Sequence, residues 1–393
     1  MRVLFLTPQL PHPVVSGGVI KSRKLIEHFA DRHEVHVCSL LKGRDADHVD
    51  DFRSRVPLAG FHSTPVDSAR SAINLLRSFV AGVPLSVFRN RCAQMRDHIA
   101  KIIASFDVVF VDHFLMFQYV PASYGGRIVL HQHNAEYVMW ERYAQVHASV
   151  PYRMAAQSES RRIRAYERAI GLRASRVLAA PNDVEALAAI GVPRERFVET
   201  LHLGDEALLA RPDVEFEDTQ PRLLYVGSLD WEANRDGLLW FLREVWPTLL
   251  ERRGDLQLVV AGRNPGEELT AEAARTRGVQ LLGFVEDLES LYATSRVFIA
   301  PLRFGSGIKV KVINALYRGL PVVTTDVGVE GLAAVSGRDL LISDDASAMS
   351  GGILELLDDS LRWSVMRDAG RDLARREYGW EPSLRRAEAA LHD

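Results

Sequence analysis

The sequence predicts an α/β protein made of two doubly wound, Rossmann-like parallel-sheet domains. Its 393 residues exceed what one hydrophobic core usually supports. Short apolar runs alternate with helical segments, which is typical of parallel sheets covered on both faces. Gly204, Pro212 and the acidic stretch from Glu215 to Asp218 interrupt this alternation near residues 203 to 221. We therefore expect one domain over residues 1–205 and a second over residues 206–375.

The first domain opens with a βαβ unit. A strand from Arg2 to Thr7 leads through a loop rich in Pro and Gly into a helix from Val19 to Ala30. Further apolar runs predict the other strands of this sheet, at Glu34–Leu40, Val108–Val111, Ile128–His131 and Val177–Ala180.

The second domain repeats the plan. An amphipathic helix from Leu238 to Leu250 follows its first strand. Its predicted strands are Arg222–Val226, Leu256–Ala261, Val279–Leu282, Val297–Ala300 and Val322–Thr325.

Composition excludes several classes of protein. The chain is 47% hydrophobic and 25% charged, as globular domains are, and its net charge of -3 gives no electrostatic case for a nucleic-acid partner. Cys38 and Cys92 are far apart and lack metal-ligand spacing, so we expect a reducing, cytoplasmic compartment and no structural metal. No apolar run reaches about 18 residues, so no membrane span is predicted.

The segment from Ala300 to Thr325 predicts an anion site. Gly305 and Gly307 free the backbone just before a helix from Lys309 to Arg318. Amide groups at a helix start favour an anion, and the Lys309 ammonium adds a full positive charge. A diphosphate suits such a place.

Two loops of the first domain carry candidate binding residues. Gly17 and Gly18 open a helix, where they let the backbone approach a phosphate or sugar, although a flexible turn is an equal alternative. In the loop after Ile128–His131, a strand-terminal histidine is suited to bond a sugar hydroxyl or to move a proton. The side chains grouped in that loop are His131, His133, Asn134 and Glu136.

Two alternatives remain open for these polar residues. A metal at His131 and His133 is disfavoured because the sequence fixes no third ligand, and Glu136 is equally suited to capping the next helix. Asp112 and His113 form a weaker pair, with an acceptor contact and a structural role both open.

A third loop, from Gly227 to Gly237, follows the first strand of the second domain. Gly227 brings the backbone close to a ligand, and Ser228 and Asn234 are candidates to bond to it. Trp231 either stacks on the ligand or covers the loop.

These motifs, in this order, resemble those of the retaining glycosyltransferases of family 4 (glycosyl transferases group 1), which have the GT-B fold. The resemblance covers nearly the whole chain. The matching elements are GG at Gly17–Gly18, HN at His133–Asn134, VGSLDWEAN at Val226–Asn234, GFVEDL at Gly283–Leu288, GSGIKVKVINALYRGLPVV at Gly305–Val323 and YGW at Tyr378–Trp380.

The resemblance implies an interdomain cleft and a C-terminal helix over residues 376–393 that crosses back to the first domain. It also implies roles for single residues. Gly17 and Gly18 would face the diphosphate and the transferred sugar, and His133 would sit near the sugar and acceptor. Phe284 and Val285 would lie at the nucleotide base of the donor.

In the second domain, Lys309 and the amides of Gly307 and Ile308 would hold the diphosphate, with Gly227, Ser228 and Asn234 also on the donor side. His133 and Lys309 would be the catalytic residues.

One departure from the family pattern is serious. The family usually carries two glutamates eight positions apart, and this chain has Ser306 and Asn314 at those positions. An Asn314 amide oxygen accepts a weaker hydrogen bond from a ribose hydroxyl than a carboxylate does. The family's usual Arg and Lys after Gly227 are also missing. The leaving diphosphate would then need charge from Arg303, Lys309 or Lys311, with a solvated surface position as the alternative for Lys311.

The resemblance predicts a retaining, metal-independent hexosyltransferase that needs no cofactor. Its co-substrate would be a nucleotide-diphosphate sugar, with UDP or GDP expected, and its acceptor a saccharide, a lipid-linked saccharide or a small molecule. A non-catalytic subunit that binds a partner glycosyltransferase, or a nucleotide-sugar epimerase or hydrolase, is the alternative. The helix from Tyr152 to Arg173, rich in arginine, suggests a peripheral contact with the inner face of a membrane, although a solvated helix face is favoured.

Overall fold

The fold is that of a computed structural model, which describes residues 1–13, 17–68, 71–146, 149–201, 203–305 and 307–392. Ser306 therefore lies outside the described residues. The chain forms two compact units. Unit 1 contains Met1–His202 and Glu381–Asp393, and unit 2 contains Leu203–Trp380.

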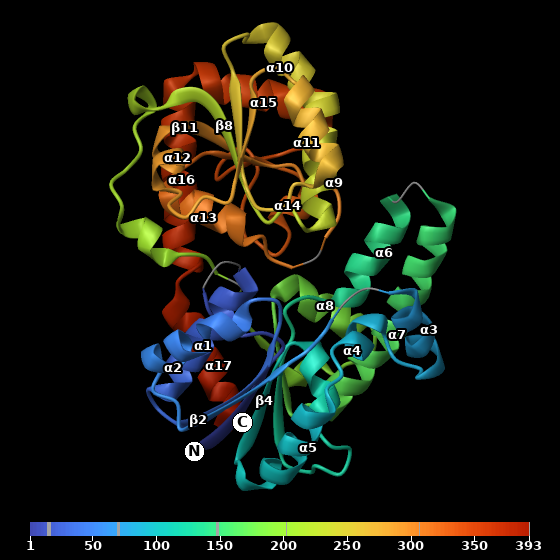
Figure 1. The fold of residues 1–393 in the computed structure, drawn as a ribbon. Coiled ribbons are helices and arrows are strands. Elements are labelled where there is room, and N and C mark those ends of the chain that lie inside the picture. Colours follow the sequence, from blue (N-terminus) through green and yellow to red (C-terminus); the bar gives the residue numbers. More distant parts are fainter. Residues whose placement is uncertain (14–16, 69–70, 147–148, 202, 306, 393) are drawn as a thin grey trace. The chain divides into compact units, whose positions relative to one another are not determined.

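Unit 1 is built on a parallel sheet with the strand order β3-β2-β1-β4-β5-β6-β7 (Figure 1). Every residue of β4 is buried, as expected of a strand covered on both faces. The order reverses between β1 and β4, which makes the carboxyl ends of these strands the usual place for a ligand. The strands are β1 (Arg2–Thr7), β2 (Glu34–Leu41), β3 (Gly60–Pro65), β4 (Val108–Asp112), β5 (Arg127–His131), β6 (Arg176–Ala179) and β7 (Phe197–Glu199).

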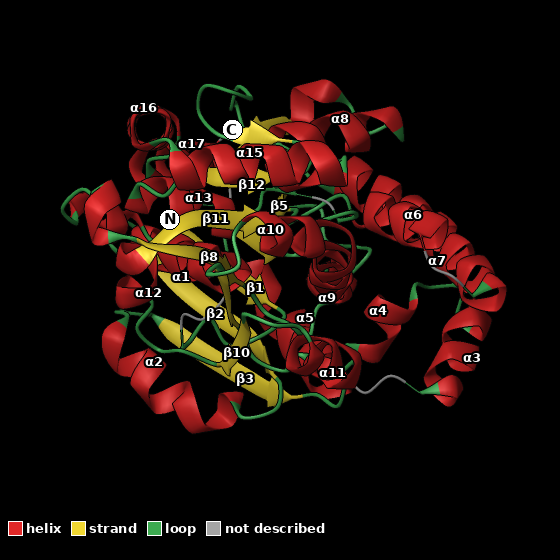
Figure 2. Cartoon of the chain, turned by 90° about the horizontal axis from the view of Figure 1, so that it is seen from above, coloured by secondary structure: helices red, strands yellow, loops and turns green. Residues whose placement is uncertain are grey.

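Helices flank this sheet (Figure 2). Phe5 of β1 stacks on Phe110 of β4 with 4.8 Å between ring centroids, and Phe29 of α1 meets Phe110 edge-on at 5.3 Å. These contacts hold α1 against the central strands, with its first residues at the carboxyl end of the sheet. The α-helices are α1 (Gly17–Ala30), α2 (Val49–Arg55), α3 (Ala72–Val80), α4 (Leu85–Arg89), α5 (Ala93–Ile102), α6 (Glu136–Val146), α7 (Val150–Arg173), α8 (Pro181–Ala189) and α17 (Trp380–His392). Short 3-10 helices span Asp45–His48, Ile103–Ser105, Phe114–Tyr119 and Arg194–Arg196.

The last helix, α17, packs on unit 1. Glu388 lies 2.8 Å from His28 of α1 (Oε2 to Nε2), and Arg127 of β5 donates to the carbonyl of Leu391 at 2.8 Å. The end of the chain therefore completes the unit in which the chain begins.

Unit 2 contains a second parallel sheet, with the order β10-β9-β8-β11-β12-β13. Its order reverses between β8 and β11. The predicted helix from Leu238 to Leu250 is α9, a π-helical turn over Phe241–Val245, and α10. The strands are β8 (Gln220–Val226), β9 (Gln257–Ala261), β10 (Val279–Gly283), β11 (Ser295–Ala300), β12 (Val322–Thr324) and β13 (Leu341–Ile342).

Helix α13 of unit 2 begins one residue later than predicted, at Val310, with Lys309 as its N-cap. It ends at Arg318 and is followed by Gly319, whose φ of 79° favours glycine. The α-helices are α9 (Glu232–Trp240), α10 (Trp246–Arg252), α11 (Gly266–Arg275), α12 (Glu289–Thr294), α13 (Val310–Arg318), α14 (Asp326–Val329), α15 (Ala346–Asp358) and α16 (Ser360–Glu377), and 3-10 helices span Glu206–Ala210 and Phe216–Asp218.

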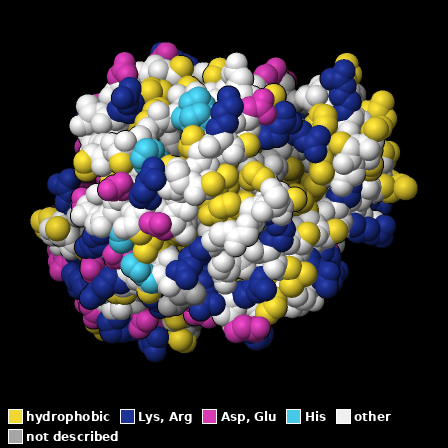
Figure 3. Space-filling view, turned by 90° about the horizontal axis from the view of Figure 1, so that it is seen from below, with side chains coloured by type: hydrophobic (Ala, Val, Ile, Leu, Met, Phe, Trp, Pro, Cys, Tyr) yellow, Lys and Arg dark blue, Asp and Glu magenta, His cyan; other side chains and the backbone are white. Residues whose placement is uncertain are grey.

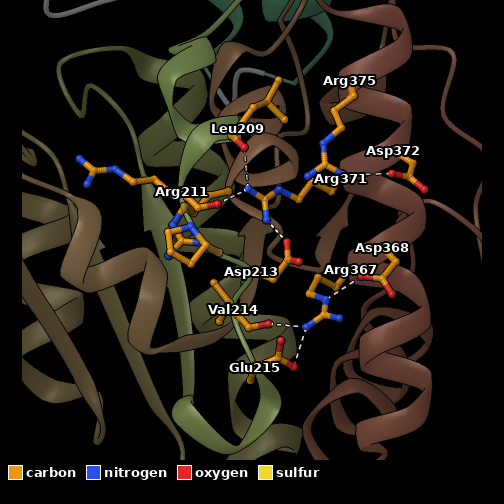
Figure 4. Close-up of polar contacts among 12 residues, drawn as sticks. Leu209, Arg211, Asp213, Val214, Glu215, Arg367, Asp368, Arg371, Asp372 and Arg375 are labelled. Carbon is orange, nitrogen blue, oxygen red and sulfur yellow. Dashed lines mark hydrogen bonds and ion pairs between the residues drawn. The ribbon is translucent and has the colours of Figure 1, made fainter.

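Two arginines of α16 fix the segment that leads into β8 (Figure 4). Arg371 is almost fully buried, donates to the carbonyl of Leu209 at 2.9 Å and pairs with Asp213. Arg367 donates to the carbonyl of Val214 at 2.6 Å and pairs with Glu215 at 2.9 Å. The acidic segment around Pro212 that interrupts the sequence pattern is therefore held by α16.

Candidate functional site

In unit 1, a buried carboxylate gathers polar residues from three strand ends. Asp112 is the last residue of β4 and is fully buried. Its Oδ1 atom lies 2.7 Å from Nδ1 of His131 and 2.8 Å from Nε2 of His133. Its Oδ2 atom accepts from Thr7 at 3.1 Å and from Ser22 at 2.6 Å. In place of the weak Asp112–His113 pair expected from the sequence, the structure shows Asp112 bound by four side chains. We call Asp112 and these four partners the Asp112 hub.

The hub fixes the orientation of His133. Burial alone would raise the pKa of Asp112, but His133 and His131 hold it well below its usual range. Burial lowers the pKa of His131 to about 3, so that ring is neutral. An ionised carboxylate only accepts hydrogen bonds, so the Nε2 atom of His133 carries a proton. The Nδ1 atom of a neutral His133 is then the acceptor, and it faces Gly18 of α1, where an added Cβ would lie 3.1 Å away.

Asp112, His131 and His133 also bring their potential ligand atoms within 4.8 Å of one another. Both oxygens of Asp112 already accept from protein groups, and both imidazoles direct a ring nitrogen at it. This chemistry favours a hydrogen-bonded hub over a metal centre.

A cavity of about 200 Å³ opens on the hub. It holds several waters by volume, enough for a substrate group. The chemistry-bearing residues in its wall are Gly18, Ser22, Lys42, Asp112, His113 and His133.

Lys42 is a cavity residue that the sequence interpretation missed. It is the first residue after β2, so its position at a strand end was the available signal. Burial, and secondarily Arg89, lowers its pKa to about 8, while Asp45 opposes the shift. The cavity therefore presents an amine beside two imidazoles.

Glu136 and His113 lie at the edge of this group. Their Oε1 and Nε2 atoms are 3.9 Å apart, and burial raises the pKa of Glu136 to about 7. Glu136 is the first residue of α6 rather than its cap. The buried Glu167 of α7 instead accepts from the backbone amides of Glu136 and Tyr137, at 2.9 and 3.2 Å.

In unit 2, Lys309 sits within its own loop. Its side chain is buried, its amine donates to the carbonyl of Gly307, and Glu330 lies 3.9 Å away. Gly305 and Gly307 have φ values of 141° and 74°, which favour glycine. Lys309, Gly307 and the buried Ile308 thus lie together at the start of α13.

Lys311 proves to be part of the same region. Its amine donates to the hydroxyl of Tyr225 at 2.8 Å and to Oδ1 of Asn234 at 2.6 Å. A Cβ added to Gly227 would lie 3.0 Å from this amine. Burial, and then the charge of Lys309, lowers the pKa of Lys311 to about 7. The Lys311 amine is thus held by protein groups and is not the solvated surface amine of the alternative.

The loop after β8 closes around Lys311. Asn234 donates to the carbonyl of Ser228 at 2.6 Å, and the Ser228 hydroxyl bonds to Asp230 at 2.5 Å. Gly227, Ser228 and Asn234 therefore lie together beside α13.

Four other candidates lie apart from this pair of lysines or have protein partners. Asn314 accepts from the backbone amide of Asp205 at 2.8 Å, so its oxygen is occupied by the start of unit 2. Arg303 forms an ion pair with Asp236 at 2.5 Å on the rim of a 630 Å³ groove between α9 and α11. Phe284 follows β10 and is exposed, and Val285 is next to it.

Comparison with known proteins identifies the family of the segment that contains these lysines. Residues 220–359 match the family model of the glycosyl transferases group 1. Over that segment, the match agrees with the group named from the motifs. The matched segment runs from β8 to the end of α15 and includes Lys309 and Lys311.

Two curated relatives share part of the chain. An uncharacterized 44.6 kDa protein of the cps region of Klebsiella pneumoniae is 30% identical over 130 residues, which are 31% of this chain and 34% of that protein. A phosphatidyl-myo-inositol mannosyltransferase of Mycolicibacterium smegmatis is 28% identical over 225 residues, which are 55% of each chain. The chain spans between a third and somewhat over half of these relatives.

A solved structure shares the fold over the full length. HepE of Anabaena, in complex with UDP and glucose, matches with a TM-score of 0.68 and 12% identity, covering 100% of this chain and 99% of that one. The two Rossmann-like units thus have the predicted GT-B fold.

Proposed function

We propose that the protein is a glycosyltransferase that moves a sugar from a nucleotide-diphosphate sugar to an acceptor. The observation that carries the proposal is the pair of lysines at the start of α13. Lys309 and Lys311 lie beside a glycine-rich loop and a helix N-terminus, an arrangement that favours a diphosphate. The mannosyltransferase name of the smegmatis relative and the UDP bound to HepE support the same function.

In this proposal, unit 2 stabilises the leaving group. Negative charge grows on the diphosphate as the bond to the sugar breaks, and preorganised positive charge at that place lowers the barrier. Lys309 and the amides of Gly307 and Ile308 supply it, and Lys311 adds to it when its amine binds a proton. The reaction then needs no metal to neutralise the diphosphate.

Unit 1 would hold the acceptor in the cavity beside Asp112. His133, oriented by Asp112, presents Nδ1 to bond or receive the proton of the acceptor hydroxyl. Asp112 itself is saturated by four donors and is therefore a poor nucleophile. We accordingly propose transfer with retention in which the hydroxyl attacks from the face that the diphosphate leaves, without a covalent enzyme intermediate.

A thermal-shift screen with UDP, GDP, TDP and ADP tests the donor half. A nucleotide that binds only the folded protein must raise the melting temperature, and the matching nucleotide sugar should then be turned over. Binding without turnover would favour a non-catalytic subunit. No shift with any nucleotide would overturn the proposed donor site.

A further inference from the structure

Helix α3 exposes its large apolar side chains, whereas a helix that packs on a core buries them. It exposes Leu76 and Val80, at 67% and 85%, and buries its polar Ser78. Such a concentration of exposed apolar side chains marks a contact with a partner or a membrane. All the large apolar side chains of α3 are exposed, namely Ile73, Leu75, Leu76, Phe79 and Val80.

The first turns of α7 also carry exposed apolar side chains. Val150, Tyr152 and Met154 are all exposed. Arg162 of α7 joins the two helices, because it donates to Ser78 at 3.2 Å and covers the Phe79 ring at 3.9 Å from its centroid. We call these eight apolar residues of α3 and α7 the α3–α7 surface, and Figure 1 shows the two helices side by side.

The exposed charged residues of α3 and α7 all have the same sign. The two glutamates of α7, Glu159 and Glu167, are buried. The only charged residue of α3 is Arg77, which is exposed. In Figure 3, basic and hydrophobic side chains share the lobe at the right. The exposed charged residues of α7 are all arginines, namely Arg153, Arg161, Arg164, Arg168 and Arg173.

We propose that the α3–α7 surface binds an anionic lipid bilayer, with its apolar side chains in the interface and the arginines at the headgroups. Apolar insertion and attraction to anionic lipid are the two contributions that hold interfacial helices. A second copy of the chain suits the surface less well, because a two-fold contact would bring like-charged arginines together. Among the described residues no helix is long and apolar enough to cross a membrane.

The sequence predicted a membrane contact by the basic helix spanning Tyr152 to Arg173. The proposal assigns this contact to the α3–α7 surface instead. Arg162 is used to hold α3, Arg164 lies over the ring of Tyr137, and Arg173 donates to the carbonyl of Pro121 at 2.9 Å. The basic helix alone therefore offers fewer free charges than its sequence suggests. Five of the eight exposed apolar side chains come from α3.

Vesicle flotation of the full chain tests the proposal, using phosphatidylcholine alone and phosphatidylcholine with phosphatidylglycerol. We expect binding to the anionic vesicles that weakens in high salt. The double variant Leu76→Glu/Val80→Glu should lower the bound fraction at least about tenfold. Arg153→Gln/Arg161→Gln should lower affinity for anionic vesicles by about 10- to 30-fold, since one arginine near an anionic surface contributes roughly fivefold.

The chain offers a matched control for the apolar pair. Leu361 and Val365 of α16 have the same residue types and spacing and are 74% and 52% exposed. Leu361→Glu/Val365→Glu should leave flotation unchanged, and circular dichroism checks that each variant folds. No flotation of the wild type, equal loss in both double variants, or a dimer that only the α3 variant dissociates would overturn the proposal. None of these readouts depends on sugar transfer.

Discussion

The Nε2 atom of His133 lies 2.8 Å from the Oδ1 atom of the buried Asp112. This contact ties the loop after β5 to the end of β4. It also determines which ring nitrogen of His133 is directed at the carboxylate.

Asp112→Asn should lower sugar transfer by about 10²-fold, on the scale of a lost proton-transfer partner. The amide keeps the size of the side chain but presents donors to His133 and His131, which must then reorient. The measurement is kcat with the nucleotide sugar that shifts the melting temperature.

A second readout separates positioning from folding. Nucleoside diphosphate affinity, which we assign to unit 2, should remain unchanged in Asp112→Asn. The matched variant Asp107→Asn alters an exposed carboxylate that accepts from the Arg2 amide at 2.7 Å, and it should keep wild-type turnover. Equal kcat in both variants would exclude the hub from the mechanism.

Gly18→Ala should lower turnover by about tenfold without lowering the melting temperature. The new methyl would lie 3.1 Å from Nδ1 of His133 and fill the cavity beside it. Alanine is the better helix former by about 1 kcal/mol, so α1 itself is not weakened. Gly351→Ala, on α15 with open space around the added Cβ, is the control. A melting temperature that falls with activity would point to packing instead.

The sequence predicted the central strands well but missed three of the four edge strands. β1 and β4 are continuous apolar runs because both faces are buried. β3, β7 and β13 lie at or near the sheet edges, and β7 and β13 are only three and two residues long. Edge strands need no apolar run, so GFHSTP in β3 gave no periodic signal.

The candidate site divides in a similar way. The glycine-rich loops could be predicted because glycine marks places where the backbone must turn or approach a ligand. The histidines could be predicted because they follow an apolar strand directly in the sequence. The partners of the Lys311 amine could not be predicted, since one of them is Tyr225, which lies 86 residues away in the chain. The contact between Asn314 and the Asp205 amide is likewise a tertiary one.

Lys309→Ala should lower turnover by about 10²-fold or more, as loss of a transition-state donor does. Its side chain is buried, so Lys309→Met serves as the variant that keeps the volume and removes the charge. Both should lose nucleoside diphosphate affinity, while Arg375→Ala on the exposed face of α16 should not. Restored activity in Lys309→Met would show that only packing matters.

Lys311→Met should change the pH dependence of stability. Burial, and then Lys309, lowers the pKa of Lys311 from 10.5 to about 7. Between these values the unfolded chain binds a proton that the folded chain does not, so the free energy of unfolding rises with pH. The slope from this one group is at most about 1.4 kcal/mol per pH unit. The Met variant should lack that contribution and give a flatter curve across the window.

Urea unfolding followed by tryptophan fluorescence measures this slope in unit 2, since all six tryptophans except Trp140 lie there. The pKa values of Lys21 and Lys42 in unit 1 are also lowered. Variant and wild type both retain these lysines, so their contributions cancel in the difference between the two curves. Lys101→Met, at an exposed position of α5, should keep the wild-type curve. Parallel curves for wild type and Lys311→Met would mean that Tyr225 and Asn234 hold a charged amine in the folded protein well above neutral pH.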